Sequence, residues 1–245
     1  MNNLIPVFEE FIRTEHRKAE NREKITKYAY EQGISYPSDE EFYLLVASQT
    51  VYGLITRIIF YLTIKRYFKD LPELYDEEIS DTSRSIRLAF SAAREKDWQA
   101  VFVEGPIDEL GIPSRAYTVI DELLANLKIY NFGELPEDVI GELFEELIEP
   151  GHRHSLGQYF TREDLVDFII GTIVQDADGY YADPTCGSGT FLIRLYNRLK
   201  YLKPQLKHHE ILEKIWGIDI GKFPAELSTI NLFRQDASNF ENFPR

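Results

Sequence analysis

A short loop from Asp183 to Thr190 carries the strongest chemical pattern in this sequence, Asp-Pro-Thr-Cys-Gly-Ser-Gly-Thr. It follows a β-prone run, 180–182, and precedes a run typical of a helix, which is where open parallel sheets bind ligands. Gly187 and Gly189 have no side chains, so a ligand can approach the backbone closely. Asp183, at the end of the predicted strand, can accept hydrogen bonds from a cationic ligand group.

A second carboxylate, Asp219, ends the next β-prone run, 214–218, and lies 36 residues after Asp183. A carboxylate in this position can accept hydrogen bonds from both hydroxyls of a ribose. It can equally cap the helix that follows. Ile220 beside it either packs on an adenine face or belongs to the core, and the sequence leaves both interpretations open.

Two common nucleotide motifs are excluded by the loop itself. It lacks the third glycine of a dinucleotide loop, and no lysine follows Gly189 as in a P-loop. A further segment, 156–161, precedes a predicted helix, whose free N–H groups favour an anion such as a carboxylate. Cys186, the single cysteine, has no evident base and is predicted to be a packing residue. No metal site is predicted, because the histidine pairs 152/154 and 208/209 lack further ligands.

The elements that position this loop alternate between strand and helix. After Pro150 and Gly151, predicted helices cover 162–174, 191–202 and 224–234, with the two β-prone runs between them. Thr161 and Asp164 resemble a capping box at the first of these helices. The order predicts an α/β class and the opening of a parallel, doubly wound sheet. With two strands only, the sheet is expected to be unfinished.

Residues 1–150 are predicted to form helices joined by short loops. The apolar run 42–68 is interrupted by Arg57, Lys65 and Arg66, so it is interpreted as a buried helix and not as a membrane span. Four helices are predicted. They cover 1–32, 81–99 and 138–148, and a further one starts at 37–39 and contains the apolar run.

The charge is strongly acidic and unevenly distributed. The net charge is −14, of which residues 1–150 contribute −13 and residues 151–245 contribute −1. Neither part offers the basic surface expected of a DNA-binding module. If the parent protein binds DNA, most of that binding is expected to come from residues outside this sequence. A single cysteine and an N-terminus that turns acidic too early for a signal peptide favour a cytoplasmic location.

Three motifs together resemble a known family. The segments GQYFT, DPTCGSGTFL and WGIDI with FPAELSTINL are similar to the first three motifs of adenine-N6 DNA methyltransferases, over roughly residues 139–235. That family includes the modification subunits of type I restriction–modification systems and the fused type II enzymes. The resemblance implies a helical domain over 1–150 and, over 151–245, the start of a Rossmann-like, S-adenosylmethionine-dependent methyltransferase sheet that is truncated.

The resemblance also implies a cofactor and roles for single residues. The segment 157–161 would hold the methionine end of S-adenosylmethionine, Asp183 and the glycine loop would surround that end and the sulfonium, and Asp219 would bind the ribose. The family usually has proline where this chain has Arg162. The residues predicted to bind the cofactor are Gly157, Gln158, Tyr159, Phe160, Thr161, Asp183, Gly187, Ser188, Gly189, Thr190, Asp219 and Ile220.

The catalytic motif of the family is expected to be absent. Those enzymes hold a flipped adenine with Asn or Asp, two prolines and an aromatic ring, and no Pro-Pro pair occurs in this sequence. No catalytic residue is therefore predicted, and the chain is expected to be an N-terminal fragment that is inactive alone. The expected partners are double-stranded DNA, through the full-length protein, and a specificity or restriction subunit.

Two other functions remain open from the residues alone. The glycine loop is shared with methyltransferases that act on RNA or protein. The acidic residues 1–150 are also compatible with a helical module that docks on partner subunits.

Overall fold

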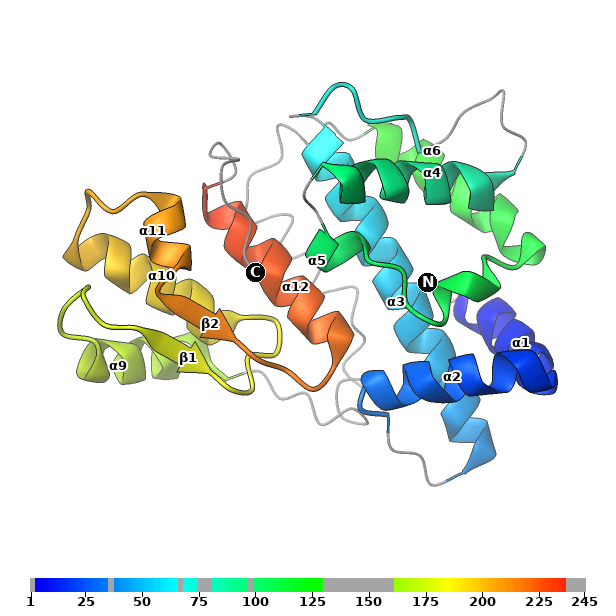
Figure 1. The fold of residues 1–245 in the computed structure, drawn as a ribbon, viewed down its shortest axis with the longest axis horizontal. Coiled ribbons are helices and arrows are strands. Elements are labelled where there is room, and N and C mark those ends of the chain that lie inside the picture. The colour runs from blue at the N-terminus through cyan, green and yellow to red at the C-terminus, as the bar shows by residue number, and fades with distance from the viewer. Residues whose placement is uncertain are drawn as a thin grey trace. The chain divides into compact units, whose positions relative to one another are not determined.

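The computed structural model describes residues 3–34, 38–65, 68–74, 81–96, 99–129 and 161–236. The chain divides into two compact units, residues 1–152 and 153–245 (Figure 1). The described residues are mostly helical, with one two-stranded parallel sheet in the second unit. The predicted helix 138–148 lies outside the described residues.

The first unit consists of helices around α3 (Asp39–Lys65). Nearly every side chain of α3 from Phe42 to Ile64 is buried, as expected of a helix that is apolar on all sides. By length and composition α3 could cross a membrane, but 78% of its most apolar window is buried inside the protein. The other elements of this unit are α1 (Ile5–His16), α2 (Ala19–Glu31), α4 (Thr82–Glu95), α5 (Gln99–Phe102), η1 (Asp108–Leu110), η2 (Ser114–Ala116) and α6 (Tyr117–Ile129).

The single helix predicted over 1–32 is wrong in one respect, because it is broken into α1 and α2. Lys18 has an extended backbone, with φ −81° and ψ 127°, where α2 begins. Ile12 on α1 and Ile25 on α2 are both fully buried, and both helices contact α3. The break therefore lets each helix turn its own apolar side to the core, which one straight helix would not do.

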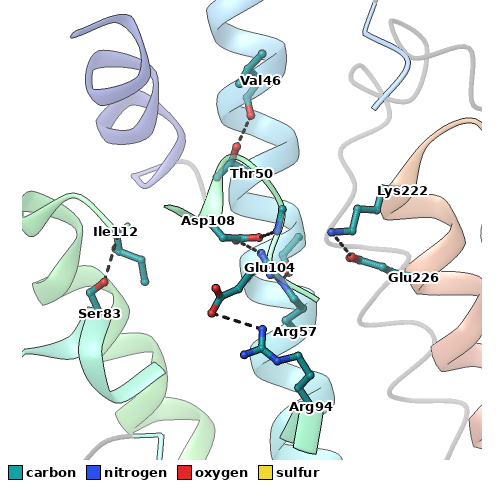
Figure 2. A network of polar contacts seen from close by, with 12 residues as sticks. Val46, Thr50, Arg57, Ser83, Arg94, Glu104, Asp108, Ile112, Lys222 and Glu226 are labelled. Atoms are coloured by element: carbon teal, nitrogen blue, oxygen red, sulfur yellow. Dashed lines mark hydrogen bonds and ion pairs between the residues drawn. The ribbon is translucent and has the colours of Figure 1, made fainter. Parts of the chain in front are cut away.

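A buried ion pair joins α3 to the first residue of η1 (Figure 2). The Arg57 guanidinium donates from Nη2 to Asp108 Oδ1 at 2.7 Å, and the Gly105 N–H donates to Asp108 Oδ2 at 2.8 Å. Arg57 Nε also faces the Gly53 carbonyl oxygen at 3.3 Å, and its guanidinium carbon lies 5.6 Å from the centre of the Phe90 ring. Only 8% of the Arg57 side chain is exposed, so this charge depends on its partners.

The second unit contains the sheet and four α-helices in its described part. Strands β1 (Tyr181–Asp183) and β2 (Ile215–Gly217) are parallel, with Asp183 opposite Gly217. Helix α10 (Thr190–Leu202) leads from one strand to the next and packs on α9 (Glu163–Ile173), on β2 and on α12 (Lys222–Phe233). The core that joins these elements includes Val166, Ile170, Leu192, Leu195, Leu199, Ile211, Ile215 and Leu232.

The predicted elements of this unit are present within two residues of their expected bounds, with additions. Helix α11 (His208–Leu212) and the short helix η3 (Arg234–Asp236) were not predicted. The capping box of Thr161 and Asp164 is wrong, because Arg162 is the N-cap of α9 and no side chain caps it. The Asp164 carboxylate instead accepts two hydrogen bonds from the Arg162 guanidinium, at 3.1 and 2.6 Å.

Removing the buried partner of Arg57 tests the polar centre of the first unit. We expect Asp108→Ala to destabilise the chain by about 3 kcal/mol, because it leaves a buried guanidinium without its carboxylate. The matched control is Glu10→Ala, which breaks the Glu10–Arg115 pair, where both side chains are more than two thirds exposed. That change is expected to cost less than about 1 kcal/mol. Urea unfolding followed by circular dichroism measures both, and equal losses would contradict the assignment.

Candidate functional site

The candidate site lies at the carboxyl ends of β1 and β2. The ladder continues past the strands, because the Ile218 N–H donates to the Asp183 carbonyl oxygen at 2.9 Å. The Cys186 N–H then donates to the Ile218 carbonyl oxygen, also at 2.9 Å. The loop that begins at Asp183 is therefore folded back over the end of β2, where Asp219 follows.

The Asp219 carboxylate joins the two strand ends. Its Oδ2 accepts the Gly187 N–H at 3.0 Å, and its Oδ1 accepts the Gly221 N–H at 2.8 Å. The helix-cap interpretation of Asp219 is wrong, because Gly221 is the N-cap of α12. A carboxylate can accept about four hydrogen bonds in total. Two acceptor positions of a rigidly held carboxylate therefore remain for a ligand.

The Asp183 carboxylate is fixed by its own turn. Its Oδ1 accepts the Thr185 N–H at 3.0 Å, the geometry of an Asx turn. Its second oxygen accepts no hydrogen bond from any residue in the described parts of the chain. Asp183, Gly187, Gly189 and Asp219 thus lie together at the strand ends, while their roles toward a ligand stay predictions.

The two loop glycines differ in what occupies the space beside them. Both have positive φ, 53° at Gly187 and 91° at Gly189. A Cβ at Gly187 would meet nothing within 4 Å, whereas one at Gly189 would lie 2.8 Å from Ser228 Oγ and 3.2 Å from Ser228 Cα. Of the two positions, the structure leaves open space for a Cβ at Gly187 alone, and the approach of a ligand there stays a prediction. At Gly189 the room is taken by α12.

Three residues that pack against the loop and β2 were not predicted from the sequence. A Cβ at Gly217 in β2 would lie 2.6 Å from Leu192 Cδ1 and 3.0 Å from Cys186 Sγ. A glycine inside a predicted strand is a known signal of such close approach. Ser228 and Asn231, both on α12, gave no signal of their own, since polar residues on a helix are ordinary.

The remaining predicted residues have different surroundings. Ile220 is 84% exposed, so the core interpretation is wrong within the described part of the molecule. Ser188 and Thr190 are half-buried at the N-terminus of α10. Thr161 is half-buried before α9, and no hydrogen bond links it to the loop among the described residues. The predicted residues Gly157, Gln158, Tyr159 and Phe160 lie outside the described residues.

The single thiol is buried under the loop. Burial raises the pKa of Cys186, and the nearby Asp219 and Asp183 carboxylates raise that pKa further. A hydrogen bond with Ser228 lowers the pKa of Cys186, but this effect is smaller than that of burial. The thiol is therefore protonated at neutral pH and is not poised as a nucleophile.

No group of three metal-ligating side chains occurs among the described residues, which include His208 and His209. The pair 152/154 lies outside the described residues. His208 on α11 is buried, and its Nδ1 lies 3.0 Å from the Tyr196 hydroxyl. Burial lowers the pKa of His208, which favours a neutral ring.

Comparison with known proteins agrees with the position of this site in the chain. The model of the family described as N-6 DNA Methylase matches residues 136–242. The EcoEI methylase subunit of a type I restriction enzyme from Escherichia coli is 23% identical over 119 residues, 47% of this chain and 24% of that subunit. The MjaVII methylase subunit from Methanocaldococcus jannaschii is 27% identical over 84 residues, 34% of this chain and 15% of that subunit. The match thus spans a quarter or less of the length of these relatives.

The different surroundings of the two glycines predict different losses of stability. Gly189→Ala is expected to cost about 3 kcal/mol, since alanine is strained at this φ and its Cβ collides with Ser228. Gly187→Ala is expected to cost about 1 kcal/mol, because its φ lies in the left-handed region and the space is open. Thermal unfolding of the two variants measures the difference. Equal destabilisation would show that α12 does not occupy the space at Gly189.

The protonated state of Cys186 predicts slow alkylation. With its pKa raised by burial, the folded chain is expected to react with iodoacetamide many times more slowly at pH 7.5 than the urea-unfolded chain. The rate should increase as the pH rises, because the thiolate fraction grows. Mass spectrometry follows the single cysteine without interference. Equal rates in the folded and unfolded chains would contradict the buried position.

Proposed function

We propose, from the premise that this chain carries an N-6 DNA methylase domain in its C-terminal half, that the strand ends at Asp183, Gly187 and Asp219 bind S-adenosylmethionine for methylation of adenine N6 in DNA. The observation that carries the proposal is the Asp219 carboxylate, held by two backbone N–H groups with acceptor positions to spare. The family uses this cofactor, and each part of the cofactor has a chemically suitable partner at this site.

Asp219 would bind the ribose. Its two oxygens are fixed by the Gly187 and Gly221 N–H groups, so the carboxylate loses little conformational entropy when a ligand binds. Two adjacent hydroxyls can each donate to one of these oxygens. The pattern corresponds to the acidic residue at the end of the second strand in dinucleotide-binding folds.

The loop would hold the methionine end and the sulfonium. Gly187 leaves open space above the backbone, and the second oxygen of Asp183 is available to a cationic group among the described residues. The N-terminus of α10 follows at Thr190, where the helix dipole favours the ligand's carboxylate. Ile220 is exposed beside Asp219 and offers an apolar contact to the adenine ring.

The fold supports a Rossmann-like arrangement. The order β1, α10, α11, β2 is a parallel strand–helix–strand unit, and in such sheets ligands bind outside the carboxyl ends of the strands. When bound, the cofactor supplies an electrophilic methyl group on its sulfonium, which the exocyclic amine of adenine attacks. In this proposal the residues of this chain orient the methyl donor, and residues that hold the adenine amine are not among the 245, since no Pro-Pro pair occurs.

We further propose that the protein acts on double-stranded DNA as part of a multisubunit, cytoplasmic restriction–modification enzyme. The relatives are named as methylase subunits of type I restriction enzymes. A specificity or restriction subunit would then be the partner, and the acidic first unit offers a surface for it. An action on RNA or protein has less support, because the matching family model is that of a DNA methylase.

The role of Asp219 can be tested on both the protein and the ligand. We expect Asp219→Asn to lower the affinity for adenosine about tenfold, since hydrogen bonds to a charged group are lost. Dideoxyadenosine, which lacks both ribose hydroxyls, should bind the unchanged chain as weakly as adenosine binds the variant. NMR titration of labelled protein measures affinities that are only millimolar.

The matched control is Glu213→Gln, which neutralises an exposed carboxylate outside the proposed site. It should leave the affinities for adenosine and dideoxyadenosine unchanged. Circular dichroism is used to check that Asp219→Asn remains folded. If the unchanged chain binds neither S-adenosylmethionine nor adenosine, or prefers dideoxyadenosine, the proposed site is wrong.

A further inference from the structure

Helix α12 contacts the loop between Asp183 and Thr190 through two polar side chains that are one helical turn apart. Ser228 and Asn231 are three residues apart and so lie on the same side of the helix. Ser228 is 4% exposed, and Asn231 is half-buried. Nothing lies within 4 Å of the position that a Cβ at Gly187 would take, so neither side chain reaches the space proposed for the ligand.

Asn231 holds one peptide unit of the loop. Its Nδ2 donates to the Ser188 carbonyl oxygen at 3.0 Å. The same peptide unit carries the Gly189 N–H, which donates to the Cys186 carbonyl oxygen at 2.8 Å. The Ser188–Gly189 peptide is thus held at both its oxygen and its nitrogen. Because peptide units are planar, this fixes the direction of the whole unit.

The orientation of the Asn231 amide is itself determined. Its Oδ1 faces Arg234 Nη1 at 3.5 Å, so the oxygen points toward a cation and the nitrogen toward the Ser188 carbonyl. Ser228 supports the loop beside it, with a hydrogen bond to the Cys186 thiol and its Cα directly under Gly189. Two positive-φ glycines flank Ser188, and a stretch with this much freedom needs external contacts to keep one conformation.

We infer that Asn231 is a positioning residue that presets the Ser188–Gly189 peptide, and with it the open side of Gly187, for the methionine end of the cofactor. The inference rests on the proposed function. It assigns to Asn231 its main effect on the methionine end of the ligand, because Asn231 contacts the loop at Ser188. Asp219, on the ribose side, is also held by the Gly221 N–H outside that loop. A hydrogen bond prepared before binding lowers the entropy lost when the ligand binds.

The test is Asn231→Asp, which keeps the shape of the side chain and replaces the donor with an acceptor facing the Ser188 carbonyl. We expect the affinity for S-adenosylmethionine to fall about tenfold, which corresponds to the loss of one hydrogen bond and added repulsion. The affinity for adenosine, which lacks the methionine end, should change less than about twofold. NMR titration of each ligand gives the ratio of the two affinities, a quantity that general destabilisation does not change.

Asn197→Asp is the matched control, because Asn197 is an exposed asparagine on α10, away from the loop. It should leave the ratio as it is in the unchanged chain. Asn231→Ala removes the donor without adding charge, and it serves if the aspartate variant does not fold. If both ligands lose affinity equally, or the ratio is unchanged, the positioning role is wrong. If the unchanged chain does not bind S-adenosylmethionine better than adenosine, the proposed function fails instead.

Discussion

The carboxylate of Asp219 is the contact on which the candidate site depends. One of its oxygens accepts the Gly187 N–H from the loop after β1, and the other accepts the Gly221 N–H from the turn after β2. A single side chain thereby joins two loops that are far apart in the sequence. Because charge-assisted hydrogen bonds to backbone N–H groups are among the stronger ones in proteins, this carboxylate holds the loops together.

The surroundings of that carboxylate differ on its two sides. On one side, Gly187 leaves open space, and the strand ends supply the carboxylates of Asp183 and Asp219. On the other side, Gly189 lets α12 approach the loop at Ser228, and Gly217 in β2 leaves room for the side chains of Leu192 on α10 and Cys186 in the loop. The same residue type thus leaves open space at one position and allows close packing at two others, and the difference lies in the neighbours of each glycine.

The two units use buried polar groups differently. In the first unit, the Arg57–Asp108 pair ties an otherwise apolar central helix to a connecting segment, and its charges are satisfied within the protein. In the second unit, the carboxylates at the strand ends keep acceptor positions that no described residue uses. Satisfied charges are typical of structural contacts, and incompletely satisfied ones at the ends of parallel strands are typical of ligand sites.

The sequence by itself determined the local features. A glycine-containing loop after a strand, an aspartate at a strand end, and a long, largely apolar helix each follow from the stereochemistry or solvation of single residues, and the family resemblance rested on the first two. Only the tertiary structure decided what depends on distant contacts: that Ser228 takes the space at Gly189, that Lys18 breaks the first helix, and that Asp219 accepts hydrogen bonds from two loops and does not cap α12. Such contacts join residues whose separation along the chain leaves no periodic pattern, so no local reading of the sequence contains them.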